Sequence, residues 1–248
     1  MTVRAALAGR VSRTRLVFAA SRGATRLAVA DAGAPLKVLR AFPLDDGRAL
    51  VQIVSASPGL LGGDRYEIEI AVEAGARAIV VTPAATKIHS MPDGAEAVQT
   101  VRLRVAAGAA LEYCPALNIP FPDAALRQSV EAQVEADGRL AVVESFALGR
   151  IGRGERRLFR RIESRVRIDY AGAPWYRDGL EIDAATAEEG AFEGRNYLAS
   201  GVWAGHVPEL TAGPADPAEP VAWGALGGEG WWFRGLFADG LEAAKALA

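Results

Sequence analysis

Apolar and polar residues alternate in three stretches of the chain, and each stretch is followed by a glycine and then by an apolar run. The stretches, glycines and runs are 66–72, Gly75 and 78–81; 100–105, Gly108 and 110–114; and 130–134, Gly138 and 140–143. Strict alternation predicts a strand with one buried face, whereas a continuous apolar run predicts a strand covered on both faces. Each unit therefore reads as strand, turn, strand.

The three units recur at nearly constant spacing, because their glycines lie 33 and then 30 residues apart. Repeats of this length bury their apolar faces against their neighbours rather than alone. The pattern predicts a mainly β protein of stacked strand repeats, either a solenoid resembling a β-helix or a sandwich, with a few short helices.

The flanking regions continue the β pattern. We expect a hairpin that pairs 25–29 with 36–39 around a turn at 31–33, and a further strand at 51–54. After Gly154, Leu158, Ile162, Val166 and Ile168 predict one long amphipathic strand ending in a turn at 171–174, and 231–235 predicts another strand.

The whole chain, 1–248, reads as a single β-rich domain with its repeat core at about 50–170. Four prolines fall between 208 and 220 and predict a loop there. Apolar residues at helical spacing predict a C-terminal amphipathic helix at about 236–247.

Charge and hydropathy exclude several classes of function. With 28 Lys and Arg against 30 Asp and Glu, the net charge of −2 gives no general attraction to nucleic acid or to anionic lipid. No apolar stretch reaches the roughly 18 to 20 residues of a membrane span, and no secretory signal follows the first arginines. We expect a cytoplasmic protein that binds neither nucleic acid nor membranes.

Cysteine and histidine are scarce. One cysteine, Cys114, forms no internal disulfide, and together with His89 and His206 it falls short of the four ligands of a closed zinc site. A metal ion handled by this chain would therefore meet mainly carboxylate or backbone oxygens.

Four acidic residues are candidates for a function. Glu112 and Glu144 lie within apolar strands, where an ionised group is costly unless it is hydrogen-bonded, paired or in a wet channel; Asp178 stands out beside them. Asp64 ends the glycine-rich turn at 57–64, which lacks the Lys-Ser/Thr of a phosphate loop. Each acid could instead be structural, either facing outward on a strand or capping a turn.

Arginines gather between Arg150 and Arg167, where eight stand against two glutamates. A solvated strand face or a protein interface accounts for them better than RNA binding does, because Phe159 is the one aromatic residue interleaved among them.

Several short motifs occur in an order that resembles the UreD family of urease accessory proteins, called UreH in some organisms. They are TRL at 25–27, PLKVLRAF at 35–42, GLLGGDR at 59–65, GARA at 75–78, TPAATK at 82–87, GAALE at 108–112, NIPF at 118–121, and LGR at 148–150 with RGE at 153–155. The chain departs from the family pattern at Pro83, where glutamine is common, and in the turn at 55–59.

The resemblance implies a non-catalytic scaffold between apo-urease and a complex of UreF with the nickel-carrying GTPase UreG. It also implies an internal passage for Ni²⁺ in transit with no permanently bound cofactor, and it allows for a dimer within the accessory complex. The acidic positions of that passage would be Asp64, Glu144 and Asp178. Scattered carboxylates suit a conduit, since imidazole and thiolate ligands would hold nickel more firmly.

Two alternatives remain open from the sequence. One is a β-sandwich or solenoid carbohydrate hydrolase with Glu112 and Glu144 as its acid pair, which requires the two carboxyls to lie about 5 to 9.5 Å apart. The other is an interaction module that handles no metal.

Overall fold

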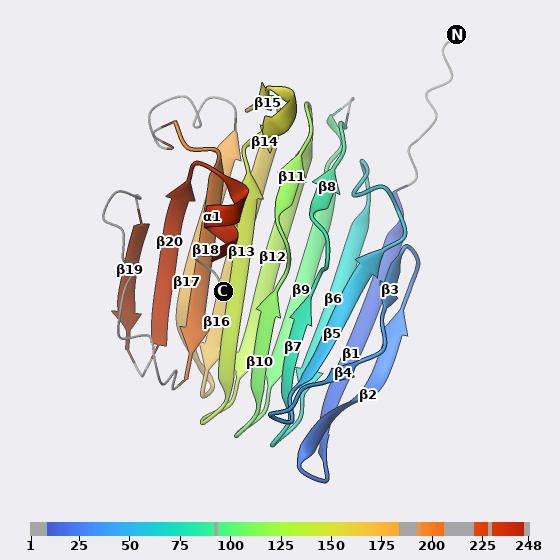
Figure 1. Ribbon diagram of the computed structural model, residues 1–248, viewed down its shortest axis with the longest axis vertical. Coiled ribbons are helices and arrows are strands. Elements are labelled where there is room, and N and C mark those ends of the chain that lie inside the picture. Colours follow the sequence, from blue (N-terminus) through green and yellow to red (C-terminus); the bar gives the residue numbers. More distant parts are fainter. Residues whose placement is uncertain are drawn as a thin grey trace.

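The structure is a computed structural model that describes residues 9–91, 94–183, 192, 194–205, 221–227 and 230–245. Within these ranges the chain forms two large β-sheets that face each other (Figure 1). The first, the seven-stranded sheet, has the order β17 (Ala173–Asp183), β16 (Arg161–Tyr170), β12 (Ala125–Val134), β9 (Ala97–Val105), β6 (Arg65–Val72), β1 (Val11–Ser21) and β2 (Ala24–Ala32).

The second, eleven-stranded sheet has a main path of eight strands. Their order is β19 (Val221–Leu226), β20 (Gly230–Phe237), β18 (Tyr197–Ala204), β13 (Arg139–Ala147), β10 (Ala110–Cys114), β7 (Arg77–Val81), β5 (Ala49–Ser55) and β3 (Leu36–Val38). Three short strands join its sides: β4 (Phe42–Pro43), β8 (Thr86–Ile88) and β11 (Asn118–Pro120). A small pair, β14 (Gly149–Arg150) and β15 (Glu155–Arg156), flanks a 3₁₀ turn at Ile151–Arg153.

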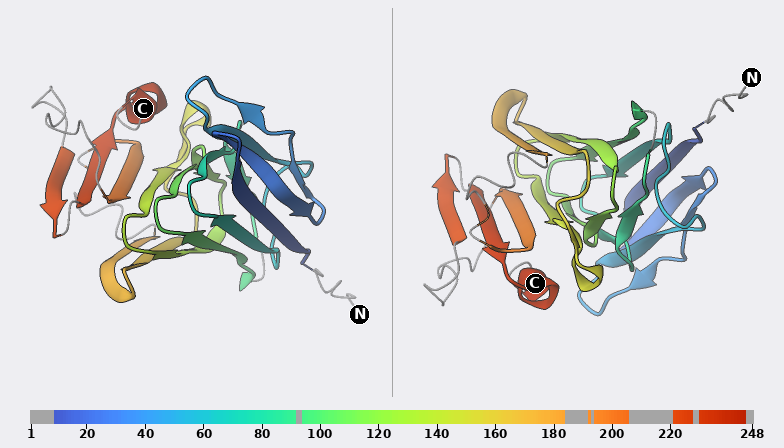
Figure 2. Two further views of the ribbon diagram at one scale, coloured as in Figure 1. Left: turned by 90° about the horizontal axis from the view of Figure 1, so that it is seen from below. Right: turned by 90° about the horizontal axis from the view of Figure 1, so that it is seen from above.

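The predicted repeats are confirmed as β6–β7, β9–β10 and β12–β13. In each, the alternating strand lies in the seven-stranded sheet and the apolar run lies in the other, and successive repeats pair in parallel. Gly75 and Gly108 have φ of 74° and 67° at the turns between the two strands, where a residue with a side chain would be strained. The architecture is therefore solenoid-like, with the three repeats stacked in chain order (Figure 2).

The core lies between the two sheets. Ile70, Leu103 and Leu126 point into it from the seven-stranded sheet, and Leu111 and Leu140 do so from the opposite sheet; all five are almost completely buried. Alternation along each strand places these residues on one face and the charged residues on the other. One face of each sheet is thus committed to the interior.

A short helix, α1 (Gly240–Lys245), packs on the outer side of the C-terminal strands (Figure 1). Its Ala243 joins a second apolar cluster with Ala199, Phe233 and Phe237. The helix begins later than the predicted 236, because Phe237 still belongs to β20. Within the described ranges, no helix combines the length and the apolar character needed to cross a membrane.

Two predictions about the flanks were wrong. Residues 24–32 pair with β1 in the seven-stranded sheet, whereas 36–38 pair with β5 in the other, so no hairpin joins them. Gly33 instead ties the connecting segment to β1, by donating its N–H to the Arg13 carbonyl at 2.7 Å. The long strand begins at Arg161, and Leu158 is exposed while Phe159 is buried. The predicted proline-rich loop at 208–220 lies outside the described residues.

Candidate functional site

A row of inward-facing residues with polar groups crosses the seven-stranded sheet. Tyr66 on β6 is in register with Gln99 on β9, which is in register with Gln128 on β12, and Gln128 in turn with Ser164 on β16. These four residues, the interior polar row, lie on strands whose other inward residues are apolar. Alternation points them inward, since the residues two positions further along each strand belong to the core.

Glu144 on β13 faces this row from the opposite sheet. The Gln128 amide donates to Glu144 Oε1 at 2.5 Å, and the Ser164 hydroxyl donates to the same oxygen at 2.7 Å. Gln99 donates to the Gln128 carbonyl oxygen at 3.2 Å, which extends the network along the row. A carboxylate is thereby held in the interior by neutral donors from two strands, one of which is supported by a third.

The surroundings of Glu144 disfavour its charge. Its exposed fraction is 5%, and this burial raises the pKa of the carboxyl above its ordinary value. The hydrogen bonds from Ser164 and Gln128 lower the pKa, while the nearby Asp178 raises it and Arg234 lowers it. A buried carboxyl in this position favours binding a proton or a cation.

Asp178 lies where the two sheets meet near their C-terminal strands. It points inward from β17 and makes an ion pair with Arg234 on β20, with 2.5 Å between Oδ2 and the guanidinium. Its side chain is 24% exposed, so this pair is closer to solvent than Glu144 is. Burial raises the pKa of the neighbouring Tyr176, and the charge of Asp178 adds to that effect. The pair connects the sheets beside the interior carboxylate.

Asp64 is buried, with an exposed fraction of 2%, at the start of β6. Its two carboxylate oxygens accept the backbone N–H groups of Arg10 and Leu61, each at 2.9 Å, and the Tyr66 hydroxyl lies 3.5 Å from Oδ2. The turn-capping interpretation of Asp64 therefore holds. Through Tyr66 it also adjoins the end of the interior polar row.

The glycine-rich turn before Asp64 owes its shape to close backbone contacts. A Cβ on Gly59 would lie 2.2 Å from the Lys87 carbonyl oxygen, and Gly63 has a φ of 86°. These constraints support the interpretation of 57–64 as a tight turn that holds Asp64 in place.

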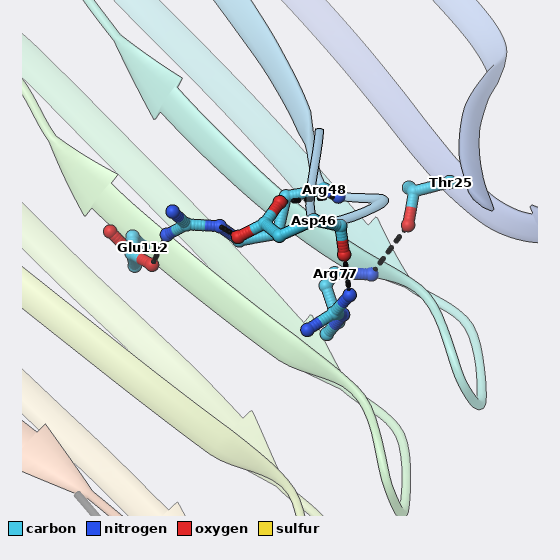
Figure 3. Close-up of polar contacts among 5 residues, drawn as sticks. All are labelled: Thr25, Asp46, Arg48, Arg77 and Glu112. Atoms are coloured by element: carbon cyan, nitrogen blue, oxygen red, sulfur yellow. Dashed lines mark hydrogen bonds and ion pairs between the residues drawn. The ribbon is translucent and has the colours of Figure 1, made fainter. Parts of the chain in front are cut away.

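Glu112 points the other way. It lies on the outer face of the eleven-stranded sheet and accepts a hydrogen bond from Arg48 at 2.7 Å, and Arg48 also contacts Asp46 (Figure 3). Asp46 in turn accepts the Arg77 guanidinium through its backbone oxygen, and Thr25 accepts the Arg77 N–H (Figure 3). Glu112 and Glu144 thus lie on opposite faces of one sheet, which does not provide the carboxyl pair of a glycoside hydrolase.

Neither His89 nor Cys114 makes a hydrogen bond to one of the candidate acids within the described residues. His89 packs its ring against Phe121, with the centroids 4.7 Å apart, and burial raises the pKa of the Cys114 thiol to about 12. His206 lies outside the described residues. In the part of the chain that the structure describes, no three His, Cys, Asp or Glu side chains form a group that could hold a metal ion.

The structure brings Glu144 and Asp178 into electrostatic contact and leaves Asp64 at the far end of the row. The sequence interpretation missed the interior amides, although a signal was present. Tyr66, Gln99 and Gln128 each stand two residues before an apolar inward position, Ile68, Val101 and Val130, and these positions are equivalent in the three repeats. A polar group recurring at one inward position in three repeats indicates an interior feature.

Comparison with known proteins agrees with these observations. Residues 10–247 match the family described as UreD urease accessory protein. The chain is similar to urease accessory protein UreD 1 of Synechococcus sp. (strain JA-3-3Ab), at 38% identity over 78% of this chain and 73% of the relative. It is also similar to urease accessory protein UreD of Deinococcus radiodurans, at 34% identity over 96% of this chain and 84% of the relative. The chain belongs to the UreD family of urease accessory proteins.

Proposed function

We propose that this protein acts in urease maturation as a non-catalytic scaffold between apo-urease and the UreF–UreG complex, and that it passes Ni²⁺ toward the urease site through its interior. The observation that carries the proposal is Glu144, a buried carboxylate held by neutral donors in a solenoid of a urease accessory family. The interior polar row supplies oxygen atoms beside it.

The chemistry of these groups suits an ion in transit. Ni²⁺ binds nitrogen and sulfur ligands more firmly than carboxylate, amide or hydroxyl oxygens. A site that must release its ion needs weak, exchangeable contacts, as ion channels do. Glu144 would offset the charge of the ion while Gln128 and Ser164 exchange their hydrogen bonds for contacts to it.

The path would run along the interior polar row. Asp64 and Tyr66 stand at one end, Glu144 faces the row from β13, and the Asp178–Arg234 pair lies beyond it, closer to solvent. In this scheme Glu144 and Asp178 are transient ligands. Asp64 shapes the entrance, because its oxygens already accept two backbone N–H groups.

The direct test is Glu144→Gln, co-expressed with the urease structural and accessory genes. Glutamine keeps an oxygen that can accept from Gln128 and Ser164, so the fold should persist while the charge is lost. We expect the nickel content of purified urease to fall about tenfold, with UreF and UreG still co-purifying with the variant.

Glu112→Gln is the matched control, since it removes an acid of the neighbouring strand on the outer face. Urease purified from cells that express Glu112→Gln should contain as much nickel as urease from cells with the wild type. Normal nickel loading by Glu144→Gln would contradict the passage, and loss of UreF binding by that variant would mean that Glu144 acts on the scaffold instead.

A further inference from the structure

The outer face of the seven-stranded sheet carries charges in cross-strand rows. One row runs Arg15, Glu69, Arg102, Glu131, Arg167 and Arg177, from β1 to β17. Signs alternate over the first five positions, which is favourable because residues directly opposite on adjacent strands interact. Alternation fails at the end, where two arginines are neighbours.

Most arginines on this face have acidic partners. Arg13 pairs with Glu67 at 3.0 Å, and Arg161 and Arg165 both contact Glu163, at 2.8 and 2.7 Å. The guanidinium of Arg177 likewise makes an ion pair with Asp169, at 2.6 Å.

Arg15, Arg65, Arg104 and Arg167 are exceptions within the described residues, and of these Arg104 and Arg167 border one hollow. In its row, Arg104 has Ala71 on one side and Gln133 on the other, neither of which is charged. Arg167 stands between Glu131, with which it makes no ion pair, and Arg177, whose charge is already matched. Both side chains are exposed, and neither makes an ion pair with any residue that the structure describes.

These two arginines line the same hollow. It has a volume of about 300 Å³ and is bordered also by Arg102, Glu131 and Asp169. A second hollow of about 520 Å³, bordered by Arg65, Arg127, Arg161 and Arg165, shares Arg167 and Glu131 with the first. The two together form one groove along β12, which we call the arginine groove.

We propose that the arginine groove is a docking surface for an acidic segment of a partner protein. Carboxylates of the segment would pair with Arg104 and Arg167, which lack an acid of their own and border the same hollow. From Arg127 to Gln133 the groove follows seven residues of β12, which span about 20 Å of strand. An extended segment of similar length would cover it.

The charge pattern of the arginine groove favours a protein partner over a nucleic acid. The groove contains Glu131 and Glu163 among its arginines, and a continuous phosphate backbone would be repelled by them. Its bordering residues include no aromatic side chain on which bases could stack. A segment with interspersed acids can place its carboxylates at the two arginines and neutral residues at the glutamates.

The test measures binding of a fluorescein-labelled peptide of alternating Glu and Ser, about ten residues long, by fluorescence anisotropy at low ionic strength. We expect Arg104→Gln/Arg167→Gln to weaken binding at least about tenfold. The control Arg13→Gln/Arg26→Gln removes the same charge from β1 and β2, away from the groove, and should change the affinity by less than about twofold.

Three results would overturn the proposal. They are absence of peptide binding by the wild type, equal weakening in the two double variants, and tighter binding of a single-stranded oligothymidylate of the same charge. The arginines substituted in this test face away from the interior. A failure of peptide binding is therefore distinguishable from a failure of the nickel passage, which Glu144→Gln tests through the nickel content of urease.

Discussion

Along β12, successive residues point alternately to the interior and to solvent, and polar groups on the two faces are held differently. Gln128 is buried and hydrogen-bonds to Gln99 on the adjacent strand and to Glu144 on the opposite sheet. Two residues of the outer face, Arg127 and Glu131, are exposed and belong to a dense field of mixed charges. The interior thus uses few polar groups with fixed partners, whereas the outside uses many that water and salt weaken.

The two faces should differ most in how strongly a substitution on β9 lowers the free energy of unfolding. Leu103 points inward and is 1% exposed, whereas its neighbour Arg102 points outward and is 46% exposed. Leu103→Ala should lower the free energy of unfolding by about 3 kcal/mol, because it removes buried methyl groups and leaves a cavity. Arg102→Ala should change it by less than about 0.5 kcal/mol. Urea unfolding of both variants checks this, and similar losses would mean that the faces are not distinct.

An intermediate effect should come from the charge of Glu144. Its pKa is raised in the folded state by burial, so the folded protein keeps the proton to higher pH than the unfolded chain does. Stability should therefore fall as pH rises from the ordinary carboxyl pKa of about 4.3 up through the folded-state pKa. Glu144→Gln lacks this loss and should be more stable than the wild type at neutral pH by about 1 kcal/mol or more.

Urea titrations between about pH 4 and 8 test the sign of this effect. The advantage of Glu144→Gln should shrink toward pH 4, where the wild-type carboxyl is protonated in both states. A variant less stable than the wild type at neutral pH would show that the charged form is the one that the interior favours.

The smallest effect should belong to an outer ion pair. Arg13 and Glu67 lie 3.0 Å apart with side chains 76% and 39% exposed. A double-mutant cycle with Arg13→Ala and Glu67→Ala should give a coupling energy below about 0.5 kcal/mol. The coupling should vanish in about 1 M salt. A coupling energy above about 1 kcal/mol would contradict this prediction, because the pair would then be as strong as the interior contacts.

The repeats could be predicted because alternation is regular wherever a strand has one wet face. The 66–72, 100–105 and 130–134 stretches all lie within strands of the seven-stranded sheet, as the pattern indicates. The orientation of Glu144 could not be predicted this way. β13 is buried on both faces from Leu140 to Ala147. The sequence around Glu144 therefore shows no alternation of apolar and polar residues that would tell which face points inward.

Partners that are distant in sequence were also beyond prediction. Asp178 meets Arg234 across 56 positions, and Arg48 meets Glu112 across 64. Such pairs depend on how two sheets face each other, which local pattern does not determine. Gln99 and Gln128 were within reach, because their inward positions follow from the alternation of their own strands.

The Asp178–Arg234 pair has a consequence for how the chain folds during synthesis. β6 to β12 can stack one after another as they leave the ribosome, but β13 has its second neighbour only once β18 is made, and Arg234 follows later still. Until then β13 presents an open edge, with Glu144 on it, to other chains. The part of the molecule that completes the interior is thus the last to arrive, and a nascent chain halted before residue 197 is where we expect self-association to begin.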